Sequence, residues 1–303
     1  MQVLVHRLCL MIPVFALGCV APIEHHDVPY DPRFGDANKM DLYLPADDAG
    51  AHPTVLFIHG GSWSGGDKTH FVNAGRRLAR SGFVVASVNY RLVPDGVFPN
   101  NIEDCLCSLA YLRAHAVEYG IDPGRIVVMG YSAGAHLASL VGLASERSEL
   151  ASDCEVAGGQ PVAPPAAVIS ASGPQDMRTF WRDAGDKAGV EKIFGGSLDE
   201  LPDAYDLGSP RFHVRPGAPP FLLLADAIDF GGIEDMRSAL ADAGNDVRRL
   251  QVAGSLHILE QHDDPGIYEA GMASETPEAW IAIEDFLVRT VGMAVTAPDG
   301  GGS

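Results

Sequence analysis

Positive charge is scarce in this sequence. Lysine and arginine number 21 against 40 aspartates and glutamates, which gives a formal net charge of −19 at pH 7. A chain this acidic repels phosphate backbones, so we do not expect nucleic acid as a partner. The acidic residues are spread along the chain, which is typical of a solvated surface. The 303 residues, 47% of them hydrophobic, suit one large α/β domain or two small ones, without internal repeats.

Cysteine is also scarce, with five residues, and no group of cysteines and histidines has the spacing of a zinc site. We therefore expect no metal and no cofactor. Cys105 and Cys107 stand two positions apart on a predicted helix and point to nearly opposite sides, so they cannot bridge each other. At most one of them pairs with Cys154, and the sequence leaves open which one, or whether all three are small buried hydrophobic residues.

The apolar run near the N-terminus, residues 8–18, is too short to span a bilayer but has the length of a signal peptide. We therefore expect residues 1–18 to direct export. The sequence ALGC at 16–19 resembles a bacterial lipobox, which predicts that Cys19 is lipidated and becomes the first residue of the mature protein. The same residues also fit an ordinary cleavage site. The protein is then either a cell-envelope lipoprotein or secreted, and a lipid on Cys19 is its only expected membrane contact.

Apolar runs of strand length alternate with segments of helical periodicity, which predicts an α/β fold. We expect a mostly parallel, doubly wound sheet of about eight strands with helices on both faces, in a domain over 28–292. Residues 293–303 are expected to form a disordered tail. Residues 174–216 lack a clean period and are predicted to form an irregular helical excursion over the sheet edge. Strands are expected near 38–44, 53–58, 83–91, 127–131, 167–171, 220–225 and 247–252, and helices near 69–80, 102–120, 235–243 and 277–288.

Residues 127–136, VVMGYSAGAH, read as an apolar strand, a sharp turn and a helix. The turn carries G-x-S-x-G, the pattern of a nucleophile elbow, in which a strained turn holds the serine hydroxyl above the end of a parallel sheet. In a chain with 34 glycines the motif alone is weak, and an ordinary serine in a glycine-rich turn is the alternative. The strand before the turn and the helix after it favour Ser132 as the candidate nucleophile.

A serine hydroxyl is a poor nucleophile unless a base removes its proton. That base should be a histidine late in the chain, after the candidate acid. His257 follows the predicted strand 247–252 and is our candidate. His262, which lies among polar residues, is the alternative.

The histidine in turn needs a carboxylate that orients its ring and stabilises its charged form. This acid should follow the strand 221–225, where the sequence offers Asp226 and Asp229. We favour Asp229, and Asp226 then serves as a solvated or turn-capping residue.

The charge that develops on the substrate oxygen needs fixed hydrogen-bond donors, which form an oxyanion hole. One expected donor is the backbone N–H of Ala133, directly after the nucleophile. The sequence His59-Gly60-Gly61-Ser62 matches an HGGG-type loop except at its last position, so we expect the amides of Gly61 and Ser62 to be the others. His59 is expected to brace this loop rather than to transfer a proton.

Taken together, these segments resemble α/β-hydrolases of the hormone-sensitive-lipase-like carboxylesterase group, in particular the bacterial branch of feruloyl and acetyl-xylan esterases. By that family pattern Ser132, Asp229 and His257 form the triad. The chain departs from the pattern at Ala225-Asp226, where the family usually has His-Gly, and at Ala135, where it usually has Gly. The resemblance rests on HGGSWSGGDK (59–68), VNYRLVP (88–94), IEDC (102–105), YGIDPGRIVVMGYSAGAH (119–136), LLLADAID (222–229) and GSLH (254–257).

The resemblance implies a serine esterase that works through an acyl-enzyme, without a cofactor, on small esters and among them acylated sugars. Kynurenine formamidases share HGG-x-W, so an aryl formamide substrate stays open. A peptidase on the same fold also stays open, although peptidases of the prolyl-oligopeptidase kind carry a propeller for which this chain has no room. A non-catalytic surface scaffold is disfavoured because every triad member is present.

The segment before the oxyanion loop is too short for an N-terminal cap helix, so 174–216 is the candidate roof of the substrate pocket. Phe180, Trp181, Ile193 and Phe194 of this segment are candidates for the pocket walls, together with Trp63. The alternative is that these four residues of the segment only pack it onto the sheet. A shallow pocket buries few methylenes, each worth about 0.8 kcal/mol. We therefore expect a preference for short acyl chains.

Overall fold

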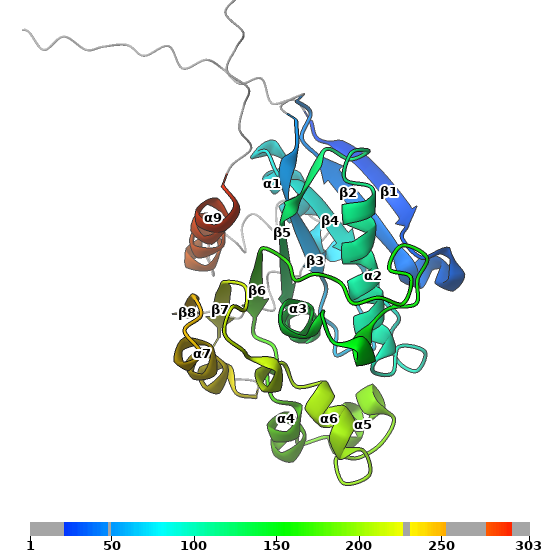
Figure 1. The fold of residues 1–303 in the computed structure, drawn as a ribbon, viewed down its shortest axis with the longest axis vertical. Helices are drawn as coiled ribbons and strands as arrows, with labels where there is room; N and C mark the ends of the chain where they lie inside the picture. Colours follow the sequence, from blue (N-terminus) through cyan, green and yellow to red (C-terminus); the bar gives the residue numbers. More distant parts are fainter. Residues whose placement is uncertain (1–20, 48–49, 227–230, 253–276, 293–303) are drawn as a thin grey trace, which may run out of the picture.

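The structure is a computed structural model of the chain, and it describes residues 21–47, 50–226, 231–252 and 277–292. Eight strands form one sheet: β1 (Ile23–Pro29), β2 (Lys39–Leu44), β3 (His52–Ile58), β4 (Val84–Val88), β5 (Ile121–Tyr131), β6 (Ala167–Ala171), β7 (Phe221–Ala225) and β8 (Val247–Gln251). Their order across the sheet is β1-β2-β4-β3-β5-β6-β7-β8 (Figure 1). β2 runs antiparallel to β1 and β4, and the other neighbouring strands are parallel.

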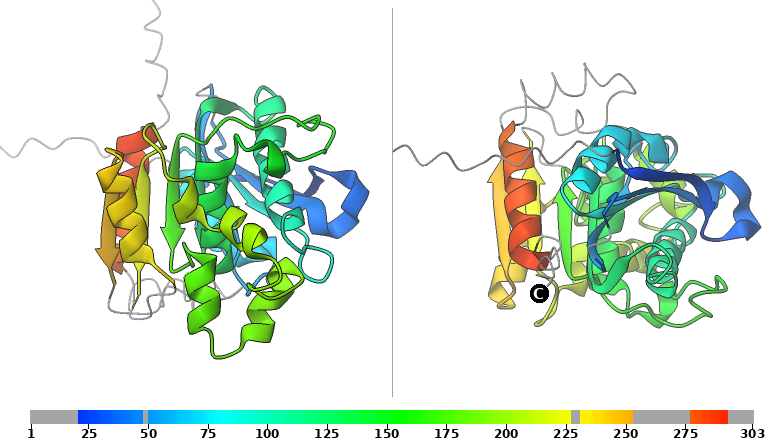
Figure 2. Two further views of the ribbon diagram at one scale, coloured as in Figure 1. Left: turned by 60° about the horizontal axis from the view of Figure 1, so that its bottom comes forward. Right: turned by 90° about the horizontal axis from the view of Figure 1, so that it is seen from above.

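Helices cover both faces of the sheet (Figure 2). On one face, α1 (Val72–Arg80) and α9 (Pro277–Val291) belong to the core that contains Val55 and Phe57 of β3. On the other, α2 (Asn100–Ala114), α3 (Ala133–Ala144) and α7 (Ile233–Asp242) belong to the core that contains Leu56 and Ile58. Successive residues of β3 thus face opposite layers, as the pleat of a strand requires. All seven residues of this strand are buried, which explains its continuous apolar run. The doubly wound α/β fold is confirmed.

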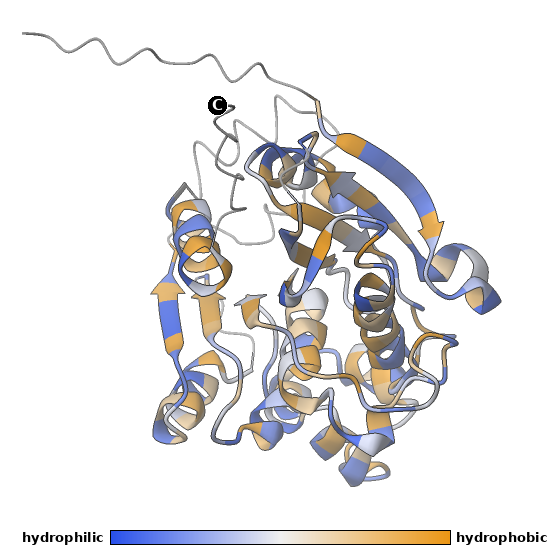
Figure 3. Ribbon diagram, turned by 45° about the horizontal axis from the view of Figure 1, so that its top comes forward, coloured by the Kyte–Doolittle hydropathy of each residue, from blue (hydrophilic) through white to orange (hydrophobic). Residues whose placement is uncertain are grey.

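The two outer strands are polar, in contrast to the apolar central strands (Figure 3). β1 reads IEHHDVP and β8 reads VRRLQ, and both are largely exposed. Charged side chains on an outer strand discourage pairing with another chain.

The sheet begins at Ile23, before the boundary at 28 that the sequence suggested. β1 escaped the sequence analysis because it is polar and lacks the alternation of a half-buried strand. Within the described residues, 3-10 helices outside the excursion are η1 (Pro32–Asn38), η2 (Lys68–Phe71), which precedes α1, and η3 (Ser148–Leu150). Residues 1–18, Cys19 and 293–303 lie outside the described residues. Among the residues that are described, no helix is long and apolar enough to cross a membrane.

The segment 174–216 forms α4 (Met177–Asp183), α5 (Lys187–Phe194), α6 (Pro202–Leu207) and η4 (Pro210–His213). The predicted helical excursion over the sheet edge is confirmed. The edge that it covers is the one formed by the carboxyl ends of the strands, where the N–H of Phe98 donates to the Ile193 carbonyl at 2.7 Å, and the N–H of Gln175 donates to the Gly231 carbonyl at 2.9 Å. The strand from which it leaves, β6, lies inside the sheet between β5 and β7.

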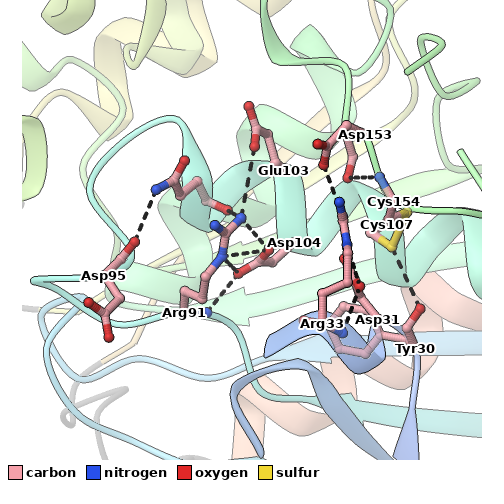
Figure 4. A network of polar contacts seen from close by, with 12 residues as sticks. Tyr30, Asp31, Arg33, Arg91, Asp95, Glu103, Asp104, Cys107, Asp153 and Cys154 are labelled. Carbon is pink, nitrogen blue, oxygen red and sulfur yellow. Dashed lines mark hydrogen bonds and ion pairs between the residues drawn. A yellow bond between two sulfur atoms is a disulfide. The ribbon is translucent and has the colours of Figure 1, made fainter. Parts of the chain in front are cut away.

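A disulfide joins Cys107 on α2 to Cys154 in the loop 146–166, with the two Cα atoms 6.1 Å apart (Figure 4). It settles the alternative that the sequence left open, and Cys105 is a buried free thiol. Beside the disulfide, Arg33 pairs with Asp31 at 2.6 Å and with Asp153 at 2.9 Å. We call η1, α2 and the loop 146–166 the stapled flank.

Candidate active site

Ser132 stands between β5 and α3 with φ 52° and ψ −124°, a conformation that is strained for a residue with a side chain. Its N–H donates to the Ala171 carbonyl at 2.8 Å. A Cβ at Gly130 would lie 2.2 Å from the carbonyl oxygen of Gly134, and a Cβ at Gly134 would lie 2.0 Å from that of Ile58. Both glycines of the motif are therefore required by close backbone contacts. The structure has the strand, strained turn and helix that a nucleophile elbow needs.

The loop that follows β3 lies against this turn, because Ile58 pairs in register with Gly130. Gly61, Ser62 and Trp63 have φ values of 108°, 53° and 56°, so three consecutive residues occupy the left-handed region. The N–H groups of Ser64 and Gly65 both donate to the Gly61 carbonyl, at 3.0 and 2.9 Å. The loop is thus a tight, strained turn. It brings the predicted donors Gly61 and Ser62 next to the turn of Ser132, whose following residue, Ala133, begins α3 and has no partner for its N–H within that helix.

His59 is buried at the start of this loop. Its Nδ1 lies 2.7 Å from the Gly60 carbonyl oxygen, and its ring stacks on Tyr90 with 4.5 Å between ring centres. The Tyr90 hydroxyl donates to the His59 carbonyl at 3.0 Å. Burial lowers the pKa of His59 to about 4, so the ring is neutral at pH 7 and Nδ1 donates to the carbonyl. These contacts agree with the expected bracing role.

His136 is a residue that the sequence analysis quoted within the motif without giving it a role. It lies on α3, one turn after Ser132, and is buried. The indole N–H of Trp63 donates to His136 Nδ1 at 3.2 Å, and His136 Nε2 lies 2.7 Å from the Gly208 carbonyl oxygen. Burial lowers the pKa of His136 to about 4. The sequence signal was an imidazole on a helix whose other residues are apolar or small.

The candidate acid Asp229 and the candidate base His257 both lie outside the described residues. The strands that precede them, β7 and β8, are parallel neighbours. The chain therefore leaves both strands at the edge of the sheet where Ser132 lies. Asp226 is buried directly after β7, with its N–H donating to Ser172 Oγ at 3.2 Å and its carbonyl accepting from the Gln251 side-chain amide. Of the two roles that the sequence suggested for Asp226, the solvated one is wrong, because the residue is buried and its backbone is hydrogen-bonded to Ser172, directly after β6.

A cavity of about 690 Å³ lies between the oxyanion loop and the excursion. Trp63 and Phe180 both line this cavity. Their rings meet edge to face, with 6.2 Å between the ring centres. Trp181, another predicted wall residue, is not among the residues that line this cavity. Its indole donates to Glu191 at 3.1 Å, and the Lys187 ammonium lies 4.0 Å from the ring centre. Successive residues of a helix point about 100° apart, so α4 turns Phe180 toward the cavity and Trp181 away from it.

The remaining cavity lining combines apolar and charged residues. Val93, Val190 and Ile193 form apolar walls beside the aromatic rings, and Asp183, Asp186 and Lys192 supply charge. Within the described ranges, no group of three or more His, Cys, Asp or Glu side chains is placed to hold a metal ion.

Comparison with known proteins places these features in a family. The BD-FAE family model matches residues 40–230. A probable isoprenylcysteine alpha-carbonyl methylesterase of Oryza sativa is 42% identical over 102 residues, which cover 34% of this chain and 24% of the relative. The probable carboxylic ester hydrolase LipM of Mycobacterium tuberculosis is 31% identical over 206 residues, covering 65% of this chain and 46% of the relative. The chain thus spans a quarter to about half the length of these curated relatives.

Solved structures share the fold. A truncated carbohydrate esterase from gut microbiota superposes with a TM-score of 0.75 at 21% identity, covering 90% of this chain and 98% of the other. A thermophilic esterase of Thermogutta terrifontis with propionate bound gives a TM-score of 0.65 at 20% identity, covering 93% and 98%. The family model covers most of the sheet, the glycine-rich loop after β3 and the Ser132 turn. The chain therefore belongs to the BD-FAE family of hormone-sensitive-lipase-like α/β-hydrolases.

Proposed function

We propose that this chain is a serine carboxylesterase that hydrolyses short-chain acyl esters through a triad of Ser132, His257 and Asp229. The proposal rests on one observation: the strained turn of Ser132 packs closely against the strained loop that contains Gly61 and Ser62. Such strain persists where the surrounding structure holds it and is typical of active sites. The relatives named esterase or carboxylic ester hydrolase support the same reaction class.

In the proposed reaction Ser132 Oγ adds to the ester carbonyl carbon while His257 takes its proton. The amides of Gly61, Ser62 and Ala133 hold the resulting oxyanion. The tetrahedral intermediate collapses, the bond to the alcohol breaks, and the alcohol leaves with the proton from His257. Water then adds to the acyl-enzyme with His257 as base, and collapse releases the acid and returns the proton to Ser132. Asp229 orients His257 and stabilises its charged form.

The proposed substrates are small esters, including acylated sugars. A cavity with aromatic walls and the charged side chains of Asp183, Asp186 and Lys192 can accept a short acyl group and hydrogen-bond a hydroxylated alcohol. Two of the structural neighbours point the same way by their titles, one as a carbohydrate esterase and one with propionate bound.

The reaction class is tested with p-nitrophenyl acetate, an N-formyl aryl amide and a peptide anilide, measured side by side on the wild type and on Ser132→Ala. We expect turnover of the acetate alone, lost in the variant. Faster turnover of the formamide or of the anilide would replace the esterase proposal by a formamidase or a peptidase. Binding without turnover of any of the three would favour a non-catalytic scaffold.

The choice of acid is tested separately. Asp229→Asn should lower kcat by orders of magnitude, because the variant no longer stabilises the charged form of His257. Asp226→Asn should cost much less, and it is the matched control from the same loop. The reverse ranking would assign the acid to Asp226.

We also propose that the protein is exported. The Cys107–Cys154 disulfide supports this, because disulfides form and persist mainly in oxidising compartments. Mass spectrometry of the natively expressed protein should find a chain that starts at Cys19 and carries added acyl mass. An unmodified start at or after Cys19 would indicate secretion without an anchor, and an intact N-terminus would contradict export.

A further inference from the structure

The hydrogen bonds of His136 define its protonation state. The Gly208 carbonyl can only accept, so the hydrogen of the ring must stand on Nε2, which lies 2.7 Å from that oxygen. Nδ1 is then the acceptor for the Trp63 indole N–H at 3.2 Å. The neutral ring with hydrogen on Nε2 satisfies both partners, whereas the charged ring would turn a second donor toward the indole. Complete burial favours the same neutral form.

This histidine connects three segments that are far apart in the sequence. Trp63 ends the strained part of the oxyanion loop, His136 lies on the helix that begins at the nucleophile, and Gly208 belongs to the excursion between α6 and η4. The N–H of His136 donates to the Ser132 carbonyl at 3.2 Å, so its position is tied to that of the nucleophile. A displacement of the loop relative to Ser132 would have to break the indole hydrogen bond or move α3.

The loop needs such a tie because its backbone is strained. Ser62 and Trp63 both have positive φ, a conformation that is strained for residues with a side chain and persists only when other contacts hold it. The N–H of Val93 donates to the Trp63 carbonyl at 2.9 Å and holds the backbone from one side. Trp63 is 4% exposed, and its single indole N–H donates its hydrogen bond to His136. Without this acceptor a buried donor would be left unpaired.

We propose that His136 is a positioning residue for the esterase reaction, which fixes the amides of the Gly61–Ser62 turn at the oxyanion by accepting the Trp63 indole hydrogen bond. The proposal rests on the proposed function. Because Nε2 is bonded to Gly208, the same ring also ties the roof of the cavity to the oxyanion loop.

The first test compares two substitutions of His136. In His136→Leu the side chain has a similar size but no acceptor, and we expect kcat for p-nitrophenyl acetate to fall about 10- to 100-fold with little change in KM, the scale of loss expected when donors shift by about an ångström. In His136→Asn the side-chain oxygen can stand where Nδ1 stands, so most of the lost kcat should return. Equal losses in both variants would contradict a role for the acceptor.

The second test separates positioning from a general loss of structure. A thionoester places sulfur, a weak acceptor, where the ester places its carbonyl oxygen, so it gains little from the oxyanion amides. We expect the ratio of kcat/KM for the oxygen ester over the matched thionoester to fall at least fivefold in His136→Leu. A merely structural defect lowers both substrates alike and leaves the ratio unchanged, and that result would overturn the proposal.

Trp63→Phe keeps the test decisive where His136→Leu does not fold, because it removes the donor and keeps an aromatic ring in place. It should lower the same ratio even though its change in the cavity wall also alters KM, and an unchanged ratio would overturn the proposal. If the wild type hydrolyses neither ester, the proposed function itself fails. If the wild type hydrolyses the oxygen ester and the variants keep its ratio of kcat/KM for the oxygen ester over the thionoester, only the role of His136 is contradicted.

Discussion

The stapled flank and the carboxyl edge of the sheet are stabilised in different ways. On the flank, the disulfide joins α2 to the loop 146–166, and Arg33 of η1 pairs with Asp153 of that loop (Figure 4). The carboxyl edge comprises 59–66, 130–136 and 172–176. Five described residues other than glycine have positive φ, and four of them, Ser62, Trp63, Ser132 and Ser172, lie at this edge.

The comparison separates stability from chemistry. Covalent and charged cross-links act where the fold must be held, whereas strained backbone and neutral, buried hydrogen bonds occur where a reacting group must be placed. Changes at the edge should therefore alter turnover more than the free energy of unfolding, and changes on the flank should do the reverse.

The largest effect is expected at Ser132. Ser132→Ala should lower kcat for p-nitrophenyl acetate by at least about a thousandfold, because the triad acts as a unit, while the free energy of unfolding stays within about 1 kcal/mol of the wild type. Ser148→Ala, at an exposed serine of η3, is the matched control and should leave both quantities unchanged. Activity of Ser132→Ala within tenfold of the wild type would end the serine-hydrolase proposal.

The second effect is expected on the flank. The disulfide closes a loop of 47 residues, and replacing Cys107 and Cys154 together by serine should lower the free energy of unfolding by about 4 kcal/mol. The kcat of the folded double variant should stay within a few fold of the wild type, with Cys105→Ala as the control for a buried thiol. A large loss of kcat in a double variant that is fully folded would show that the stapled flank and the carboxyl edge are coupled.

The third effect shows where the edge does contribute to stability. Burial holds the pKa of His59 and of His136 at about 4, below the value of 6.5 expected in the unfolded chain. The unfolded chain therefore binds more protons between these values, and the free energy of unfolding should fall as the pH drops from about 6.5 toward 4. Each pKa unit corresponds to about 1.4 kcal/mol, so each histidine should account for a loss on the order of 3 kcal/mol.

Urea unfolding of the wild type and of His136→Asn at pH 7 and pH 4.5 measures this loss. The variant should lose less stability between the two pH values, because it lacks the imidazole of His136. The remaining difference belongs to titrating groups common to both proteins, among them His59 and His213, whose pKa burial also lowers. Parallel pH profiles of the two proteins would show that His136 titrates normally in the folded state.

The smallest effect concerns the substrate. We expect kcat/KM for p-nitrophenyl esters to peak between acetate and butyrate and to be low by octanoate, because the gain of about 0.8 kcal/mol per buried methylene stops at the cavity wall. Phe180→Ala should move the optimum to longer chains. For each added methylene that the new space holds, kcat/KM should rise about fourfold. Trp181→Ala, whose side chain points away from the cavity, should leave the profile unchanged. A wild-type profile that rises through decanoate would indicate a tunnel.

Much of the fold could be predicted because its signals are local. The buried strand 52–58, the elbow around Ser132 and the oxyanion loop each show their structure within about ten residues of sequence. β1 could not be predicted, because a polar outer strand is recognisable only by its pairing with β2. The absence of Trp181 from the lining of the cavity could not be predicted either, because the rotation of a short helix about its axis depends on what it packs against.

The sequence by itself determined the class of the fold and the segments that meet at Ser132, since strand order and turn chemistry follow from hydrophobic period and glycine placement. Only the tertiary structure decided which cysteine pairs with Cys154, and that His136 accepts from Trp63 and donates to Gly208. These contacts join residues 47, 73 and 72 positions apart. Partners so distant in sequence are chosen by the packing of whole helices on the sheet, and no local pattern of residues specifies them.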